Sequence, residues 1–145
     1  MKTAIRYRIV GEKTKLPAPQ LKTSADVSDY CRKYLYDGDI YVQESLYVLM
    51  FNNNLELNGF AQISSGAMNC CFCDMKILCR YVIEQMCSGV IIVHNHPSGK
   101  TIPSAQDKEL CSKIKGAMSV LDIRLLDFLI ITDESHVSFC DEGLI

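Results

Sequence analysis

Two histidines separated by one residue directly follow a short apolar run in the middle of the chain. His94 and His96 come after residues 90–93, which the pattern predicts as a strand buried on both faces. Because side chains alternate along an extended backbone, both imidazoles are expected on the same side. Pro97 also favours an extended conformation of His96. The two rings are therefore placed where a single ion could bind both.

An acidic residue completes this set of candidate ligands. Asp107 follows in the first turn of a helix that the spacing predicts over residues 104–121. Two imidazoles and one carboxylate form a common open catalytic zinc site, with water as a further ligand. Zinc lowers the pKa of that water to roughly 7 and makes it a nucleophile at neutral pH. We therefore predict a Zn²⁺ site formed by His94, His96 and Asp107.

Hydrolysis at such a site also needs a group that accepts a proton from the water. Glu44 is the candidate, because it precedes the strand expected at residues 46–51 and folding does not require an acid there. Taken alone, Glu44 is more simply explained as a surface carboxylate. A single histidine in a loop is more simply explained as a polar residue that makes hydrogen bonds and binds no metal. Ser104 and Asp107 also have the spacing of a helix-capping pair, which is compatible with metal binding.

The elements that position these residues alternate between helices and strands. Helical spacing predicts helices over residues 24–36, with Ser24 as the cap, 74–87 and 104–121. Strands are expected over residues 46–51, 55–63, 90–93, 125–132 and 136–140, the first two forming a hairpin. This order predicts an α/β domain with a mixed sheet and helices on both faces. Sites in such sheets gather at the carboxyl ends of strands.

The first 24 residues differ from the rest. Residues 5–10 alternate apolar and basic side chains and predict a strand, and an extended connection with two prolines follows. We therefore divide the chain into an N-terminal strand and arm, residues 1–24, and a domain, residues 25–145. The net charge of −2 argues against a dedicated nucleic-acid binder. A solvated arm or a local DNA contact remains open for its basic residues, which are Lys2, Arg6, Arg8, Lys13, Lys15 and Lys22.

Hydropathy and cysteine usage indicate the compartment. No apolar run approaches the roughly 18 residues of a membrane helix, and no apolar block follows the charged N-terminus as in a secretory signal. We expect a cytosolic protein, with its eight cysteines reduced. Cys70, Cys71 and Cys73 lack the paired spacing of zinc sites and are expected to be buried or loop thiols.

The spacing around the histidines resembles a known family. His94-x-His96-x7-Ser104-x-x-Asp107 is similar to the JAB/JAMM metalloprotease signature. The sequences at residues 94–99, 103–107, 126–131 and 138–139 resemble its bacterial RadC-type branch, over residues 25–145. The resemblance implies a cytidine-deaminase-like α-β-α layered fold, zinc on His94, His96 and Asp107, and Glu44 as general base. It further implies that Ser104 stabilises the oxyanion and that a peptide or isopeptide bond of a protein or peptide substrate is hydrolysed.

The sequence also departs from this family in three places. RadC-type proteins commonly carry a helix-hairpin-helix region before this domain, and only the short arm precedes it here. Cys73-Asp74-Met75 replaces a usual His-Pro-Arg, and Asp127-Phe128 replaces a usual Asp-His. The positions expected to bind metal and catalyse are all present. RadC-type proteins carry a DNA-repair designation without naming a substrate.

Two other functional classes remain open beside the hydrolase. Some JAB-type domains serve as non-catalytic interaction modules, and a DNA-associated repair factor would use the basic arm. Iron or manganese could occupy a similar ligand set. A nucleobase deaminase needs H-x-E followed by P-C-x-x-C, whereas His96 stands two residues after His94 and no P-C-x-x-C occurs. The sequence does not fix the oligomeric state.

Overall fold

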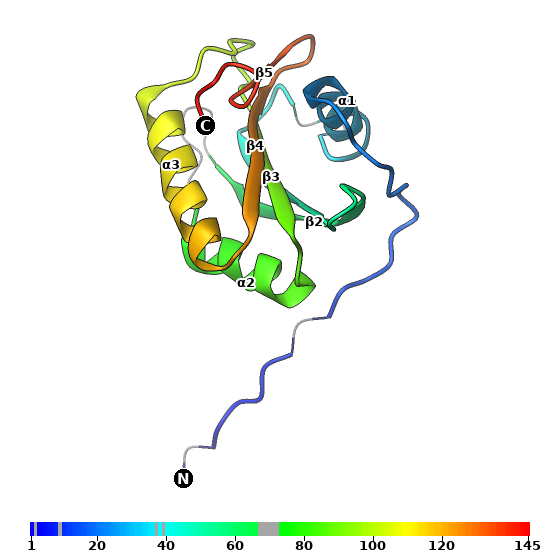
Figure 1. Cartoon of the computed structure of the whole chain (residues 1–145), viewed down its shortest axis with the longest axis vertical. Coiled ribbons are helices and arrows are strands. Elements are labelled where there is room, and N and C mark those ends of the chain that lie inside the picture. Colours follow the sequence, from blue (N-terminus) through cyan, green and yellow to red (C-terminus); the bar gives the residue numbers. More distant parts are fainter. Residues whose placement is uncertain (2, 9, 37, 39, 67–72) are drawn as a thin grey trace.

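The computed structural model spans the 145 residues and describes all of them except 2, 9, 37, 39 and 67–72. Helices and strands alternate along most of the chain (Figure 1). In chain order they are α1 (Ser24–Tyr34), β1 (Ser45–Phe51), β2 (Leu57–Ser65), α2 (Met75–Gln85), β3 (Gly89–Asn95), α3 (Ala105–Val120), β4 (Arg124–Ile131) and β5 (His136–Ser138). The predicted helices and strands of the domain are all present, with shifted ends.

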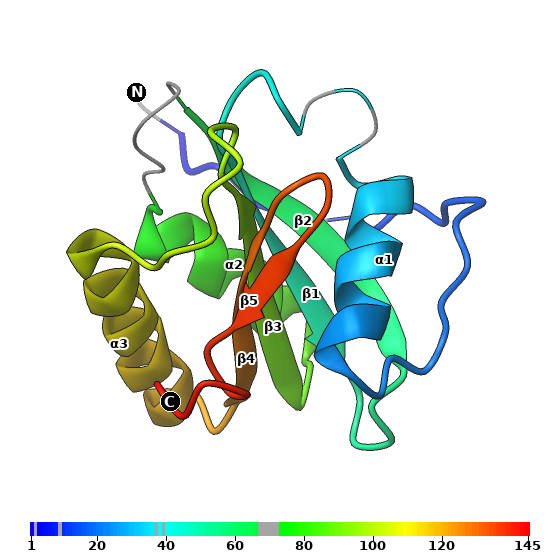
Figure 2. The same ribbon diagram turned by 90° about the horizontal axis from the view of Figure 1, so that it is seen from above.

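The strands form one mixed sheet in the order β2-β1-β3-β4-β5. β3 and β4 are parallel and are connected through α3, whereas the other neighbouring pairs are antiparallel. Helix α1 covers one face of the sheet, and α2 and α3 cover the other (Figure 2). The predicted α/β architecture with a mixed sheet and helices on both faces is thus confirmed.

The hydrophobic core is divided between the two faces of the sheet. Alternate residues of β3 belong to different clusters: Val90 and Ile92 pack with α2 and α3, and Ile91 and Val93 pack with α1. Every residue of β3 is buried, as expected for a central strand with a continuous apolar run. Continuing this alternation places His94 on the α3 side and Asn95 on the α1 side.

Two of the shifted helix boundaries have a clear local cause. Thr23, rather than Ser24, caps α1, because its side chain accepts from the Asp26 amide while the Asp26 carboxylate accepts from the Thr23 amide. Ser24 has no acidic partner at the corresponding position, so the reciprocal capping box selects Thr23. Helix α2 ends at Gln85, because the C-cap residue Met86 adopts a left-handed conformation with φ of 56°.

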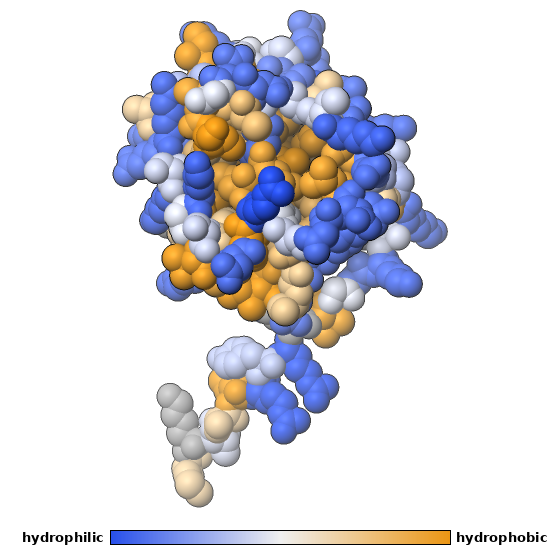
Figure 3. All heavy atoms as spheres, in the orientation of Figure 1, coloured by the Kyte–Doolittle hydropathy of each residue, from blue (hydrophilic) through white to orange (hydrophobic). Residues whose placement is uncertain are grey.

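The predicted N-terminal strand is wrong for the described residues between 5 and 10. They form neither strand nor bridge, and Ile5, Tyr7 and Val10 are 71%, 81% and 78% exposed. Alternation alone does not make a strand, since the backbone also needs a ladder partner. Figures 1 and 3 show this arm extending away from the body of the domain. Of its basic residues, Lys2 lies outside the described part of the chain.

Within the described residues, no helix has the length and apolar character needed to cross a membrane.

Candidate metal site

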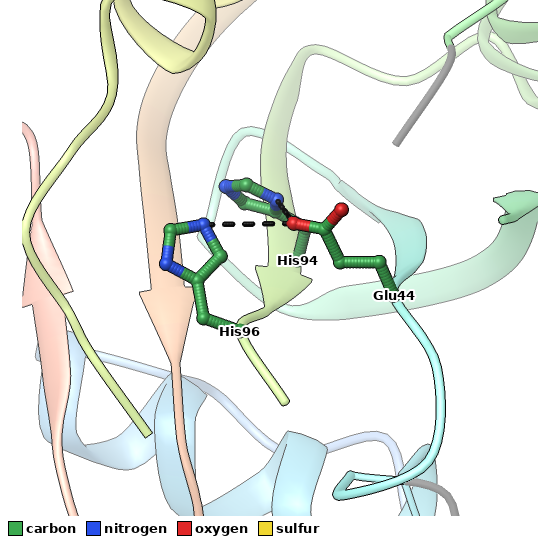
Figure 4. Close-up of side chains that lie close together, drawn as sticks. All are labelled: Glu44, His94 and His96. Carbon is green, nitrogen blue, oxygen red and sulfur yellow. Dashed lines mark ion pairs between the residues drawn. The ribbon is translucent and has the colours of Figure 1, made fainter. Parts of the chain in front are cut away.

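Four ionisable side chains meet at the carboxyl end of β3. His94 and His96 come from the strand and the residue after its end, Asp107 from the first turn of α3, and Glu44 from the loop before β1. The closest atoms of each histidine and each carboxylate lie between 3.4 and 3.7 Å apart. Figure 4 shows the Glu44 carboxylate facing both imidazoles, with one oxygen, Oε1, paired to both rings. The structure therefore brings together the residues that the sequence singled out.

The His94 ring is the most deeply buried member of this cluster. It is 1% exposed, and its ring lies 5.3 Å from Phe128 and 4.9 Å from His96, measured between centroids. Neither ring nitrogen makes a hydrogen bond to any described residue. Buried polar atoms are normally paired, so two orphaned nitrogens on one ring need a physical explanation. A metal ligand is one such role.

The His96 ring is fixed by a backbone contact. Its Nδ1 atom lies 2.7 Å from the Lys100 carbonyl oxygen. A carbonyl only accepts, so Nδ1 carries the proton and neutral His96 has its lone pair on Nε2. Nε2 lies 3.6 Å from both Glu44 Oε1 and Asp107 Oδ2. This arrangement is typical of histidine ligands, whose second nitrogen donates to an outer partner.

Asp107 is held by the start of α3. Ser104 is the N-cap: its Oγ accepts from the Asp107 amide at 3.0 Å, and its own amide donates to Asp107 Oδ2 at 2.7 Å. The other carboxylate oxygen, Oδ1, lies 3.4 Å from His94 Nε2. The Asp107 carboxylate therefore completes the capping box and also faces both histidines. The capping role of Ser104 and Asp107 is thus compatible with metal binding by Asp107.

Glu44 is held through its backbone. The Gly66 amide donates to the Glu44 carbonyl at 2.8 Å, and the Asn95 side chain bonds to the residues on either side of Glu44. Its carboxylate is 8% exposed, and Oε2 has no hydrogen-bond partner among the described residues. Sequence reasoning missed Asn95. The available signal was its place between the two histidines, which puts it on the opposite face of β3.

The electrostatics of the cluster differ from residue to residue. Burial lowers the pKa of His94 to about 4, so its ring is neutral at pH 7. Burial also opposes the charged form of His96, but the Asp107 carboxylate and the Lys100 carbonyl outweigh it and raise its pKa. Burial works against ionisation of Asp107 too, yet His96, His94 and the Ser104 contacts lower its pKa to about 2. Burial raises the pKa of Glu44.

The donor geometry fits a small divalent ion. Zinc bonds to nitrogen or oxygen of about 2.1 Å in a tetrahedron place the donor atoms ~3.4 Å apart. His94 Nε2 lies 3.4 Å from Asp107 Oδ1, and His96 Nε2 lies 3.6 Å from Asp107 Oδ2. Neutral His94 has a lone pair on one of its two nitrogens, and neutral His96 has one on Nε2, so each ring can donate to such an ion. The residues present therefore fit a bound divalent metal ion.

The geometry also contains a second donor set. Glu44, His94 and His96 each offer one ligand atom, and these atoms all lie within 4.8 Å of one another. The two sets share both histidines and differ in the carboxylate. The lowered pKa of Asp107 suits a permanent ligand, whereas the raised pKa of Glu44 suits a group that exchanges a proton.

A groove of about 370 Å³ opens beside His96. Its walls are residues 40 and 41, Pro97 and Gly99, and the turn at residues 132–135. Arg32 in α1 fixes that turn, donating from Nε to the Thr132 carbonyl at 2.8 Å and from Nη2 to the Ser135 carbonyl at 2.7 Å. The groove therefore opens at the edge of the cluster, where His96 lines it.

Cys73 and the remaining histidine, His136, lie outside this cluster. Cys73 is buried in the core beside α2, while Cys70 and Cys71 lie outside the described residues. His136 Nε2 lies 3.2 Å from Ser24 Oγ, a contact between β5 and the start of α1. Cys73 and His136 therefore add no ligand to the site.

Comparison with known proteins identifies the family. The family model described as "RadC-like JAB domain" matches residues 21–144. The chain belongs to the RadC-like JAB domain family. This confirms the resemblance, and the match begins just before α1, so the RadC-like domain contains the whole sheet and the four clustered side chains.

Curated relatives of this RadC-like domain include several bacterial proteins named UPF0758. One from Flavobacterium johnsoniae is 40% identical over 101 residues, which is 70% of this chain and 44% of that protein. One from Porphyromonas gingivalis is 35% identical over 71% of this chain and 46% of its own length. One from Acinetobacter baylyi is 33% identical over 88% of this chain and 46% of its own length. The matched part thus spans about half of these relatives.

Proposed function

We propose that this RadC-like JAB domain is a zinc-dependent hydrolase of JAMM type that cleaves a peptide or isopeptide bond. The observation that carries the proposal is the buried His94 ring, whose two nitrogens lack hydrogen bonds while carboxylates lie 3.4 and 3.7 Å away. A ring desolvated in this way is costly unless something binds it. His94, His96 and Asp107 would hold the zinc, and Glu44 would remain beside it.

When bound, zinc would supply a Lewis acid that polarises a carbonyl and lowers the pKa of water. The chain's own residues supply the rest of the chemistry. The Glu44 carboxylate would take a proton from the attacking water and return it to the leaving nitrogen. Its raised pKa favours both transfers, because a base with a pKa nearer 7 also acts better as an acid.

Ser104 would have two roles in this reaction. Its Oγ accepts the Asp107 amide proton and so shapes the first turn of α3. Its hydroxyl hydrogen takes no part in that bond and would donate to an oxyanion formed from the substrate carbonyl. A polypeptide would reach the cluster along the groove beside His96. A protein substrate needs such an open groove, because a chain that continues on both sides of the cleaved bond cannot enter a closed cavity.

The zinc content of the protein tests the metal site. Untagged wild type is expected to hold about one zinc per chain and Asp107→Ala none, since three protein ligands are needed for a stable catalytic site. Glu44→Gln is the matched control, because it removes a neighbouring carboxylate's charge without removing a proposed ligand. Metal-free wild type after zinc loading would contradict the proposal and would favour a non-catalytic interaction module.

A peptide and isopeptide substrate screen tests the chemistry. Glu44→Gln is expected to keep zinc and to lose about 100-fold or more in hydrolysis, the usual contribution of a general base. Wild-type activity in Glu44→Gln would contradict the assigned role. The same screen with the metal-loaded and chelated forms of wild type separates zinc-dependent turnover from a contaminating protease.

A further inference from the structure

Asn95 stands between the two histidines, yet its side chain lies on the other side of the strand. Neighbouring residues of an extended strand face opposite sides, so His94 and His96 point toward the site while Asn95 points toward α1. Asn95 is fully buried. A buried primary amide is costly unless its donors and acceptor are paired. The partners of Asn95 therefore indicate what it does.

The Asn95 side-chain amide makes three hydrogen bonds, all to backbone groups of residues 40–45, which are the loop before β1 and the first residue of β1. Its Oδ1 accepts from the Ser45 amide at 2.8 Å, and its Nδ2 donates to the carbonyls of Ile40 and Gln43, each at 2.9 Å. Exchanging the oxygen and nitrogen would set a donor against a donor and an acceptor against two acceptors. The orientation of the amide is therefore fixed by its partners.

These contacts continue the sheet beyond its last backbone pair. The β1–β3 register ends at Leu46 opposite His94, so Ser45 and Asn95 are the next positions on the two strands. The Asn95 side chain bonds to Ser45 at this position. The bond to Gln43 then fixes the other neighbour of Glu44. The backbone on both sides of Glu44 is thus tied to the strand that carries the histidines.

The Glu44 side chain has little else to hold it. Its Oε2 has no hydrogen-bond partner among the described residues, and Oε1 lies 3.7 Å from His94 Nδ1 and 3.6 Å from His96 Nε2. In Figure 4 the carboxylate extends from its loop toward the imidazoles. The position of the Glu44 carboxylate therefore depends largely on where the backbone of Glu44 is held.

We propose that Asn95 is a positioning residue that sets the place of the Glu44 carboxylate relative to the two histidines. It acts through the backbone of residues 43 and 45, and it touches neither a proposed ligand side chain nor the substrate. The inference rests on the proposed function in one respect, because the position of Glu44 matters for hydrolysis only if Glu44 is the general base. Its structural content, the tether between β3 and the Glu44 loop, stands on the three hydrogen bonds alone.

Amide hydrogen exchange of the metal-free protein tests the tether directly. Asn95→Ala is compared with Ser138→Ala, which also removes a buried side-chain hydrogen bond, the one to Asp127. We expect the Ser45 amide to exchange about tenfold or more faster in Asn95→Ala than in Ser138→Ala, because its acceptor is gone. The Ile92 amide, in the middle of β3, is expected to stay within about threefold of that control. Equal Ser45 exchange in both variants would overturn the inference.

Cobalt loading tests whether the tether positions Glu44. Cobalt(II) takes similar ligands to zinc, and its visible spectrum responds to groups beside the ion. The visible spectrum of the cobalt protein is recorded against pH. When Asn95 is unchanged, Glu44→Gln is expected to shift the midpoint of the pH-dependent spectral change by about one pH unit. In the Asn95→Ala background, the same change is expected to have less than about a third of that effect, since coupled sites are not additive. A full shift in both backgrounds would overturn the inference.

The two measurements separate the inference from the function on which it rests. Wild type that binds neither zinc nor cobalt would defeat the proposed metal site, while hydrogen exchange would still decide the tether. If Asn95→Ala does not fold, Asn95→Asp replaces it in the cobalt comparison. Asp keeps the shape and the acceptor for Ser45, but it sets an oxygen against the Ile40 and Gln43 carbonyls, so the same loss of coupling is expected.

Discussion

Ser104 and Asp107 cap each other at the start of α3, and the same Asp107 carboxylate faces both histidines. The Ser104 amide donates to Oδ2 at 2.7 Å, while Oδ1 lies 3.4 Å from His94 Nε2. A capping residue is usually a matter of helix stability alone. Here the cap also fixes the orientation of a proposed ligand, because the carboxylate that closes the capping box cannot rotate freely. Folding of α3 and assembly of the site are therefore linked.

Replacing Ser104 separates its capping role from its proposed catalytic role. Ser104→Ala is expected to lower the free energy of unfolding by about 1 kcal/mol, the usual cost of a lost N-cap. Ser104→Gly is the control, because glycine at an N-cap costs only a few tenths of a kcal/mol and has no side-chain donor. Both variants keep the backbone amide that holds Asp107, so both are expected to keep zinc.

Hydrolysis by the two Ser104 variants then decides the second role. If the hydroxyl stabilises an oxyanion, turnover is expected to fall about 100-fold in both variants, although Ser104→Ala is the more destabilised of the two. Wild-type turnover in Ser104→Gly would limit Ser104 to capping. Urea denaturation and steady-state kinetics of the same preparations supply the two readouts.

Metal binding should stabilise the folded protein and distinguish the two donor sets. A ligand at about 1,000 times its dissociation constant adds ~4 kcal/mol to the free energy of unfolding. Zinc is expected to raise the melting temperature of wild type and of Glu44→Gln but to leave Asp107→Ala unchanged. Magnesium is the control ion, because it prefers an all-oxygen shell. Stabilisation of Asp107→Ala with loss in Glu44→Gln would instead support the set containing Glu44.

The pH dependence of stability should reveal the buried His94. Its folded-state pKa of about 4 lies below the unfolded value of 6.5, so between these values the unfolded chain binds the extra proton. The free energy of unfolding therefore falls as the pH drops from 6.5 to 4, by roughly 3 kcal/mol at most for this group. His96 acts in the opposite direction, because its pKa is raised and its contribution is lost as the pH rises through that value.

Comparing variants isolates the His94 contribution. Denaturant unfolding in the presence of a chelator is measured at several pH values between 7.5 and 4.5 for wild type and His94→Asn. As the pH falls, the free energy of unfolding of wild type is expected to decrease more than that of His94→Asn, because asparagine does not bind a proton in the unfolded chain. A difference that stays constant with pH would show that His94 titrates as an exposed histidine.

The parts of this site that sequence could predict are those encoded by local periodicity. Alternation along β3 placed His94 and His96 on one side, and the S-x-x-D spacing placed Asp107 at the start of α3. Asn95 escaped prediction because its partners are about 50 residues away in a loop without a regular pattern. No local period encodes such a contact.

The arm and the groove show the same limit. Residues 5–10 have the alternation of a strand, but the described ones lack the ladder partner that only tertiary structure provides. The groove depends on Arg32 of α1, which fixes the turn at residues 132–135 by bonding to its carbonyls. Three-dimensional packing alone brings that turn beside His96.

Tyr41 should contribute to substrate binding without affecting the metal site. It lines the groove, it is 61% exposed, and its hydroxyl donates to Asp133, which raises its pKa. Aromatic rings exposed at a binding site supply contact area at low entropic cost. Tyr41→Ala is therefore expected to raise KM for a peptide substrate about fivefold or more, with kcat within about threefold, since the ring would contribute uniform binding.

Tyr7→Ala is the matched control for Tyr41→Ala, because Tyr7 is an exposed tyrosine in the arm. Both variants are expected to keep zinc and to change the free energy of unfolding by less than about 0.5 kcal/mol, as is usual for surface substitutions. A rise in KM confined to Tyr41→Ala would place the substrate in the groove. Equal KM values in both variants would show that the polypeptide approaches His96 from another direction. A substrate bound in the groove would contact the Tyr41 ring, so its removal would raise KM.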